Sequence, residues 1–152
     1  SARQAVNMSS DDAAGILLRF NNGARATISI SQISSGRKNS INWEISGPEG
    51  SLAFDSENPE QLWIGHRGRA NELLHKDPGM LSADAAKTAF YPGGHVEGFS
   101  ETFRGLFERV YADINNETES NSYPTFADGV KSLEITDAIA QSSKNLAWVK
   151  IA

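Results

Sequence analysis

The sequence predicts an α+β domain, an open and mainly antiparallel β-sheet with helices packed on one face. The first observation is a series of short segments that are rich in alternating apolar residues and separated by brief turns, which is typical of antiparallel strands. The second is a pair of longer segments whose apolar residues recur every three or four positions, as on the buried side of amphipathic helices. The helices can cover the apolar face of the sheet, which leaves the other face available for oligomerisation.

Six strands are expected in the N-terminal half, at 12–20, 24–33, 40–46, 51–55, 61–65 and 70–76. Asn21-Asn22-Gly23 separates the first two and favours a hairpin, because Asn and Gly tolerate positive φ. The segment 24–33 alternates regularly, with Ala and Ile facing one way and Arg, Thr and Ser the other. A further strand is expected at 146–151, whereas 77–90 and 115–122 lack a clear period and are expected to be loops.

Two helices are expected, at 95–116 and 125–145. The first follows directly on a Pro-Gly-Gly-His turn. The second begins after Pro124, with Thr125 as a possible cap and Asp128 in the first turn, where a carboxylate is favoured by the helix dipole.

The composition suits one domain with an ordinary core, with a linker or lead-in at 1–11 and the domain itself at 12–152. The net charge of −5 argues against a nucleic-acid partner, and the apolar runs are too short to cross a membrane. The absence of cysteine excludes disulfides and thiolate sites and fits a cytoplasmic location. No metal site, G-x-G-x-x-G or Walker-type loop can be drawn, so the chain itself is expected to bind no cofactor or metal.

His95 is the strongest candidate for binding a substrate. It lies where the turn is expected to become a helix, next to free N–H groups and the positive end of the helix dipole. A neutral imidazole there can hydrogen-bond a substrate hydroxyl, and the alternative is that His95 only caps its helix. Gly93 and Gly94 are expected to serve the shape of the backbone, and Glu97 to lie in the first helical turn, where a carboxylate is stabilised anyway.

Three more candidates lie at the end of the strand at 24–33 and in the loop after it. Arg37 and Lys38 lie in a Gly-containing loop, where basic side chains can meet a carboxylate, a phosphate or sugar hydroxyls. Gln32, at the end of the strand, can point into a cleft. The alternative for the loop is a solvated hairpin tip. The tryptophans are expected in the core or in an interface rather than as platforms for sugars: Trp43, Trp63 and Trp148.

Three segments carry a family resemblance. They are DDAAGILLRFNNGARATISISQISSGRKNSINWEISGPEGSLAFDS, YPGGHVEGFSETFRGLFERVYADI and YPTFADGVKSLEITDAIAQSSKNLAWVKI. In this order they resemble the C-terminal domain of the Gfo/Idh/MocA oxidoreductases, the family of glucose–fructose oxidoreductase and inositol dehydrogenase. The resemblance extends over about residues 10–151.

The resemblance implies a two-domain parent protein. This chain would be the second domain, which shapes the pocket for a small-molecule sugar or polyol and builds a homodimer or homotetramer. The missing N-terminal Rossmann domain would hold NAD or NADP and the Glu-Lys-Pro motif with the catalytic lysine. The family's active-site Asp/His pair finds no match here, so the chain is expected to contain no catalytic residue and to be inactive alone.

Two other functions stay open on the sequence. One is a non-enzymatic module that uses the same sheet to dimerise or to hold a small ligand. The other is a free-standing hydrolase or isomerase that uses His95, for which the sequence offers no evident nucleophile. The coding sequence upstream of Ser1 distinguishes the oxidoreductase domain from these two functions. A strand–G-x-G-x-x-G–helix unit there supports the oxidoreductase.

Overall fold

The computed structural model describes residues 5–115 and 123–151. It divides the chain into two compact units. Unit 1 consists of Ser1–Lys38 and Ala127–Ala152, and unit 2 of Asn39–Phe126.

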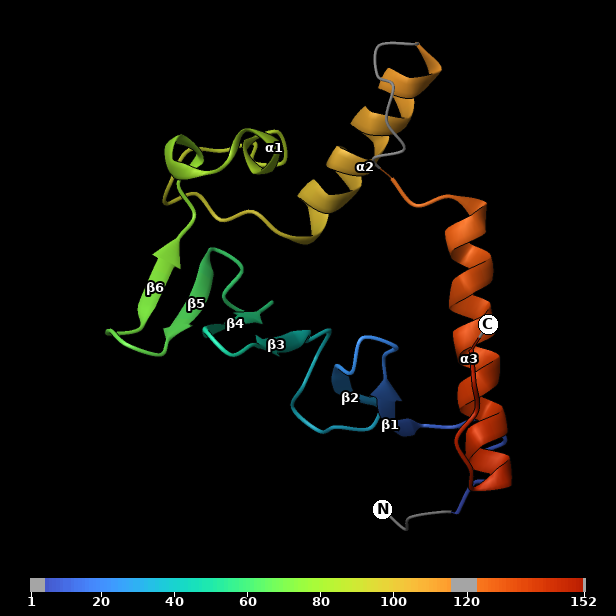
Figure 1. The fold of residues 1–152 in the computed structure, drawn as a ribbon. Coiled ribbons are helices and arrows are strands. Elements are labelled where there is room, and N and C mark those ends of the chain that lie inside the picture. Colours follow the sequence, from blue (N-terminus) through green and yellow to red (C-terminus); the bar gives the residue numbers. More distant parts are fainter. Residues whose placement is uncertain (1–4, 116–122, 152) are drawn as a thin grey trace. The chain divides into compact units, whose positions relative to one another are not determined.

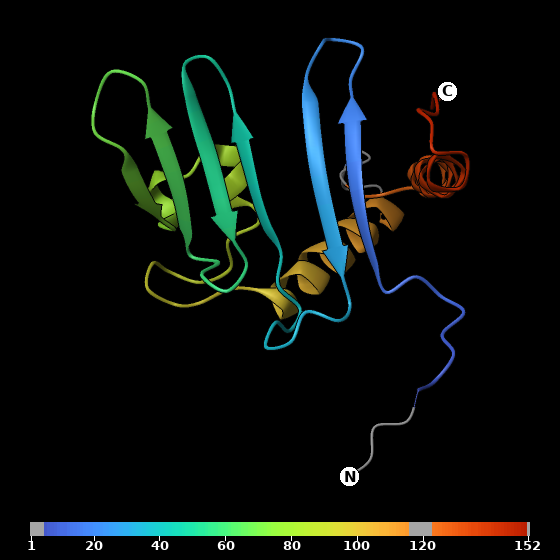
Figure 2. The ribbon, with the colours of Figure 1, turned by 90° about the horizontal axis from the view of Figure 1, so that it is seen from below.

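Unit 1 contains an antiparallel hairpin and a long helix. Its elements are β1 (Ala13–Arg19), β2 (Arg25–Ser31) and α3 (Phe126–Asn145). The two strands pair with Ile16 opposite Ile28, and their hairpin is seen in Figure 2. The turn between them forms as predicted, because Gly23 adopts a φ of 89° and Asn22 Oδ1 accepts a hydrogen bond of 3.0 Å from Ala24 N–H.

The end of α3 differs from the expectation. The strand predicted at 146–151 is wrong, because no strand forms there. Leu146 adopts a left-handed φ of 51°, and Ala147 N–H donates to the Ser142 carbonyl at 3.3 Å. Ser142 Oγ–H donates back to the Ala147 carbonyl at 2.7 Å. These bonds close the helix with a reversal of the chain, which the apolar residues of this segment do not reveal.

The core of unit 1 lies between β1 and α3. Ile16 of β1 and Ala138 of α3 are its buried hydrophobic residues, each 8% exposed. They line a cavity of about 650 Å³ together with the C-terminal residues that follow α3. The Arg19 guanidinium lies 4.3 Å from the centre of the Trp148 ring, a cation–π contact that holds the C-terminal segment beside β1.

Unit 2 contains a four-stranded antiparallel sheet in the order β3-β4-β5-β6 (Figure 1). The strands are β3 (Asn42–Ser46), β4 (Gly50–Asp55), β5 (Gln61–His66) and β6 (Glu72–His75). Side chains directly opposite each other in the register share a face of the sheet. One face is apolar and consists of Trp43, Ile45, Leu52, Phe54, Leu62, Ile64 and Leu74. The other is mixed and includes Asn42, Glu44, Ala53, Asp55, Gln61, Trp63 and Leu73.

The α+β fold class is confirmed, with the strands divided between a two-stranded and a four-stranded sheet. All six strands of the N-terminal half form within two residues of the predicted bounds, and the differences of two residues are at the end of β2 and at the starts of β3 and β6. The helix predicted at 125–145 is confirmed as α3, with Asp128 in its first turn. The expected loop at 115–122 lies outside the described residues apart from Asn115.

The region 77–90 is more ordered than a loop. It contains a 3₁₀ turn, η1 (Pro78–Met80), and a short helix, α1 (Ala83–Ala86). Asp77 Oδ1 accepts from Gly79 N–H at 3.0 Å, and Ser82 Oγ accepts from Ala85 N–H at 3.3 Å. The two caps stabilise turns that are too short to show a hydrophobic period, so the sequence analysis missed them.

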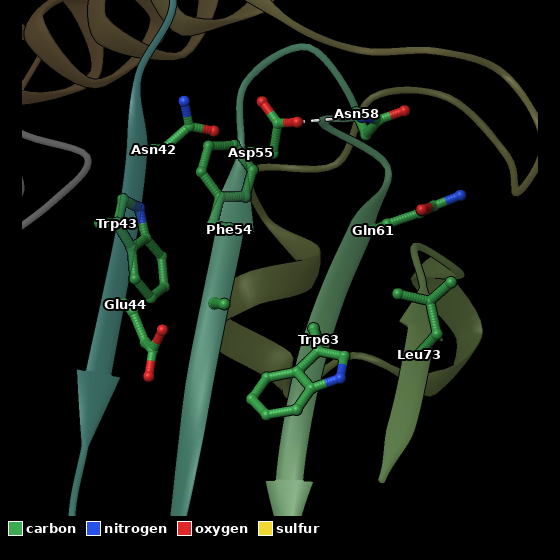
Figure 3. A pocket seen from close by; sticks show the side chains of 10 residues that line it. Asn42, Trp43, Glu44, Phe54, Asp55, Asn58, Gln61, Trp63 and Leu73 are labelled. Atoms are coloured by element: carbon green, nitrogen blue, oxygen red, sulfur yellow. Dashed lines mark hydrogen bonds between the residues drawn. The ribbon is translucent and has the colours of Figure 1, made fainter.

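The long helix of unit 2 is α2 (Phe99–Ile114). Figures 1 and 2 show α1 and α2 on one side of the sheet β3–β6. Figure 3 shows Glu44, Trp63 and Leu73 of the mixed face on the other side, with a helix behind the strands. In the described part of the chain, no helix combines the length and the hydropathy that a membrane span requires.

Candidate functional site

The Pro92–His95 turn is a tight reversal that lies against the end of β6 in space. His95 N–H donates to the Pro92 carbonyl at 3.2 Å, and Gly94 adopts a φ of 81°. Gly93 lies against the strand end so closely that a Cβ atom on it would be 3.4 Å from the Lys76 carbonyl oxygen. Both glycines therefore serve the shape of the backbone, as the sequence predicts.

His95 does not lie at the start of the helix. The prediction that α2 begins at residue 95 is wrong, because α2 begins at Phe99 with Gly98 as its N-cap. The Glu101 carboxylate accepts from Gly98 N–H at 2.8 Å and performs the capping. This geometry excludes the alternative role of His95 as a helix cap. The prediction that His95 lies next to the free N–H groups of the helix is also wrong, because three residues separate it from Phe99.

Residues 95–98 stay outside α2 because a buried cluster of charges holds them. We call Glu60, Lys76 and Glu97 the Lys76 cluster. The Lys76 ammonium lies 2.7 Å from Glu97 Oε1 and 3.2 Å from Glu60 Oε2. Their side chains are 18%, 14% and 10% exposed, in the order Glu60, Lys76, Glu97. The cluster thus joins the start of β5, the end of β6 and the segment before α2.

The Glu97 side chain joins the two ends of the segment 90–97. Its carboxylate accepts hydrogen bonds from the backbone N–H groups of Phe90, at 2.9 and 3.1 Å, and of Tyr91. Its own backbone N–H donates to Glu60 Oε1 at 2.7 Å. A carboxylate that caps residues 90 and 91 in this way cannot at the same time serve the first turn of a helix, which explains why the helix starts later.

The charges of the cluster stabilise one another. Burial by itself would raise the pKa of Glu97, but the hydrogen bonds from Lys76, Phe90 and Tyr91 outweigh it and hold the pKa below its ordinary value. Burial would lower the pKa of Lys76, but the hydrogen bond to Glu97 and the negative charges of Glu97 and Glu60 outweigh it and raise the pKa. Both groups are therefore ionised over the whole physiological range.

The cluster also fixes the main chain at His95. Lys76 Nζ–H donates to the His95 carbonyl oxygen at 2.9 Å. The His95 side chain, in contrast, is exposed within unit 2. The structure thus gives a histidine whose backbone is held at a buried ion cluster and whose ring is accessible.

The other predicted site residues belong to unit 1. Gln32, Arg37 and Lys38 are exposed and follow β2. Gln32 N–H donates to the Asp12 carbonyl at 2.8 Å, and Arg37 N–H donates to the Ser34 carbonyl at 3.2 Å. His95 lies in the other unit, so a joint role of these residues with His95 stays a prediction.

A second feature is an open depression of about 470 Å³ on the mixed face of β3–β6 (Figure 3). Five apolar residues line it: Trp43, Ala53, Phe54, Trp63 and Leu73. The remaining lining residues carry carboxylates and amides: Asn42, Glu44, Asp55, Asn58 and Gln61. The Trp63 ring lies over Gly65, where a Cβ atom would be only 2.5 Å from the indole. The glycine therefore lets the indole lie flat along β5.

Among residues 5–115 and 123–151, no group of three or more His, Asp or Glu side chains could hold a metal ion. Every strand pairing in these same residues is antiparallel. They therefore lack the parallel strand–helix–strand unit whose Gly-rich turn binds a pyrophosphate, and they do not fit a nicotinamide dinucleotide.

Glu60 and Lys76 were not among the site residues predicted from the sequence. Glu60 and Lys76 are 37 and 21 positions from Glu97, so no local pattern connects them to it. One signal existed. Glu60 directly precedes β5 and Lys76 directly follows β6, and in an antiparallel pair these two ends meet. The bond of 2.8 Å from Lys76 N–H to the Glu60 carbonyl shows that they do.

Comparisons of the sequence and of the structure with known proteins all point to one family of oxidoreductases. The family model for the oxidoreductase family, C-terminal alpha/beta domain, matches residues 1–151. Levoglucosan dehydrogenase from Pseudarthrobacter phenanthrenivorans is 26% identical over 152 residues, which cover 93% of this chain and 36% of that protein.

The solved structures agree in fold. An oxidoreductase from Sinorhizobium meliloti has a TM-score of 0.86 and 30% identity and covers 93% of this chain and 42% of its own. Levoglucosan dehydrogenase in complex with NADH and levoglucosan has a TM-score of 0.81 and 27% identity, with 94% and 39% covered. The chain thus spans between 36% and 42% of the length of these proteins.

Proposed function

Because the chain belongs to the Gfo/Idh/MocA oxidoreductase family, as its C-terminal α/β domain, we propose that it is the substrate-binding and oligomerisation domain of an NAD(P)-dependent oxidoreductase that acts on a sugar or polyol. The observation that carries the proposal is the similarity over 94% of the chain to a levoglucosan dehydrogenase that was solved with NADH and a sugar-derived ligand. The proposal places the cofactor and the catalytic lysine in a preceding domain.

His95 is the residue of this chain to which we assign substrate contact. Its ring is exposed, its main chain is fixed, and a neutral imidazole can both donate to and accept from a hydroxyl group. Gln32, Arg37 and Lys38 are the further candidates, since amide and cationic groups suit the hydroxyls of a sugar or polyol. NAD(P), bound elsewhere in the parent protein, would accept the hydride from the alcohol carbon.

The mixed face of β3–β6 is the surface that we assign to oligomerisation. It has an exposed aromatic ring at Trp63 and an apolar neighbour at Leu73, surrounded by polar groups. Buried aromatic residues with a polar rim are typical of association surfaces, and a stable one buries at least about 1,000 Å² in total. A second copy of the chain, bringing its own mixed face, would cover this surface.

The enzymatic proposal is tested on the full-length protein that contains this sequence. Oxidation of levoglucosan and myo-inositol is followed by NADH or NADPH formation, and we expect turnover with at least one of the two. His95→Ala should raise the KM for the alcohol about tenfold or more and leave the KM for the nucleotide unchanged. His75→Ala, an exposed histidine on β6, is the matched control. Absence of turnover with a panel of sugars and polyols would favour the non-enzymatic module.

Two measurements on the 152-residue chain complete the test. Calorimetry with NAD⁺ and NADP⁺ should show no binding, and micromolar affinity would contradict the assignment of the cofactor to another domain. Light scattering should show a dimer or larger, and Trp63→Ala should shift it toward the monomer while the exposed Met80→Ala does not. A monodisperse wild-type monomer at tens of micromolar would remove the oligomerisation proposal.

A further inference from the structure

The Lys76 cluster is an unusual use of charge for a domain of this size. Three charged side chains are largely withdrawn from water at one point: Glu60, Lys76 and Glu97. Burying charges is expensive, and replacing a buried ion pair with apolar residues is often neutral or stabilising. A contribution to overall stability alone therefore does not explain the cluster, and its geometry offers another explanation.

The Lys76 ammonium is directed at the turn that carries His95. It donates hydrogen bonds to the His95 carbonyl oxygen at 2.9 Å and to Glu97 Oε1 at 2.7 Å, and it contacts Glu60 Oε2 at 3.2 Å. The third contact is an ion pair without hydrogen-bond alignment, since Glu60 Oε2 has no hydrogen-bond partner. Two of the three contacts thus end on residues 95 and 97, on one side of the turn.

The other side of the turn is held through the same carboxylate. Glu97 accepts from the N–H groups of Phe90 and Tyr91, so the two ends of the segment 90–97 are joined at one group. Phe90 in turn packs on the start of α2, with its ring 4.1 Å from the Arg104 guanidinium. Between these anchors lie Gly93 and Gly94, which without the anchors would have wide conformational freedom.

We propose that Lys76 is a positioning residue, which together with Glu97 and Glu60 holds the main chain of His95, so that the exposed ring meets the substrate from a fixed backbone position. The proposal deepens the proposed function and rests on it. Fixing a substrate-contacting side chain from behind lowers the entropy lost on binding, and a displacement of about 1 Å can reduce the rate about 100-fold.

The first test measures the turn itself, independently of catalysis. Amide hydrogen exchange is recorded on the 152-residue chain for Phe90, Tyr91 and Glu97. Lys76→Met removes the charge and keeps the length of the side chain, and exchange at these amides should become at least about tenfold faster. Lys76→Arg should restore most of the protection. The matched control is Lys87→Met, which removes the exposed ion pair with Asp84 in the same segment and should change nothing.

The second test separates positioning from a general loss of structure. In the full-length protein, Lys76→Met should lower kcat/KM for levoglucosan or myo-inositol about 10-fold to 100-fold, with the KM for the nucleotide unchanged. In a His95→Ala background the same substitution should have little further effect, because Lys76 acts through His95. Lys87→Met should be as active as the wild type.

The outcomes distinguish this inference from the proposed function. Unchanged exchange in Lys76→Met, or losses from Lys76→Met and His95→Ala that simply add, would overturn the positioning role even in an active enzyme. If the full-length protein oxidises no sugar or polyol, the proposed function fails and the substrate role of Lys76 with it, whatever the exchange shows. If Lys76→Met does not fold, Glu60→Gln, which keeps the acceptor for Glu97 N–H, should give a smaller change in the same direction.

Discussion

Two glycine-containing loops carry the residues that the sequence singled out, and they are built in different ways. The turn at 91–98 of unit 2 is tied to β5 and β6 by two side chains, Lys76 and Glu60, which lie 21 and 37 positions from Glu97. The loop at 32–38 of unit 1 is shaped by neighbours, for example Ser34 Oγ–H donating to Ser31 Oγ and Arg37 N–H to the Ser34 carbonyl. Similar composition thus hides a difference in how firmly the backbone is fixed.

The two loops differ in how far along the sequence their hydrogen-bond partners lie, rather than in the number of their hydrogen bonds. A local hydrogen bond can reform after the loop moves, because both partners move together. A contact between a loop and the edge of a sheet is lost when the loop moves, and the charge that it leaves behind is then buried without a partner. We therefore expect substitutions in the turn at 91–98 to lower the free energy of unfolding more than similar substitutions at 32–38.

The largest effect is expected for Glu97→Ala. It leaves the Lys76 ammonium with one carboxylate and leaves the N–H groups of Phe90 and Tyr91 without their acceptor. We expect the free energy of unfolding to fall by about 3 kcal/mol, measured by urea denaturation of the chain. Asp84→Ala, which removes an exposed carboxylate from a lysine, should leave it unchanged and is the matched control. Equal losses for the two would refute the distinction.

The next effect is a dependence on pH. The pKa of Glu97 is lowered in the folded chain below its ordinary value of 4.5, so ionised Glu97 contributes stability that is complete above about pH 4.5. That contribution disappears as the pH falls through the lower pKa of the folded state. The urea midpoints of the wild type and Glu97→Gln should therefore differ at pH 7 and converge toward pH 3. A gap that stays constant between these two values would show that the charge of Glu97 is irrelevant.

A smaller effect separates the two loops directly. Gly94 and Gly36 both have positive φ, 81° and 85°. Gly94→Ala should lower the free energy of unfolding by about 1–2 kcal/mol, because the anchored turn cannot adopt another conformation. Gly36→Ala should cost less, about 0.5–1 kcal/mol, since its loop can relax. The reverse order would mean that the loop at 32–38 is the more rigid of the two.

The smallest effect is expected in unit 1. Arg19→Met removes the cation–π contact with Trp148 and keeps most of the aliphatic side chain. We expect a loss of about 0.5–1 kcal/mol in the free energy of unfolding. Arg25→Met, at the exposed position opposite Arg19 in the hairpin, is the control. A loss from the control of the same size would assign the effect to charge in general rather than to Trp148.

The strands of this fold could be predicted well because their signal is local. Alternation of apolar residues and the Asn-Gly turn place β1 and β2 within a few residues of their observed ends. The same reasoning failed at 146–151, where an apolar segment follows a helix and the reversal at Leu146 depends on side-chain bonds to Ser142. Propensity cannot distinguish an extended apolar segment that pairs with a sheet from one that packs on a helix.

The site could be predicted only in part for a related reason. Gly93, Gly94 and His95 stand together in the sequence and were recognised as a unit. Glu97 was assigned to the first helical turn because its spacing fits, and its actual partners lie in β5, β6 and the preceding loop. Which of two structures a carboxylate stabilises depends on long-range contacts that pattern analysis does not contain.

The indole that lies along β5 has a consequence for how this sheet can vary. Trp63 fills the volume that any side chain at position 65 would need, and Gly50 on the neighbouring strand is restricted in turn, since a Cβ atom on it would lie 2.5 Å from the Gly65 carbonyl oxygen. A side chain at position 65 therefore requires the Trp63 ring to move, whereas position 50 is limited by the backbone of the neighbouring strand. A larger residue at position 65 would displace the indole and remove the flat aromatic surface beside Leu73 on the mixed face.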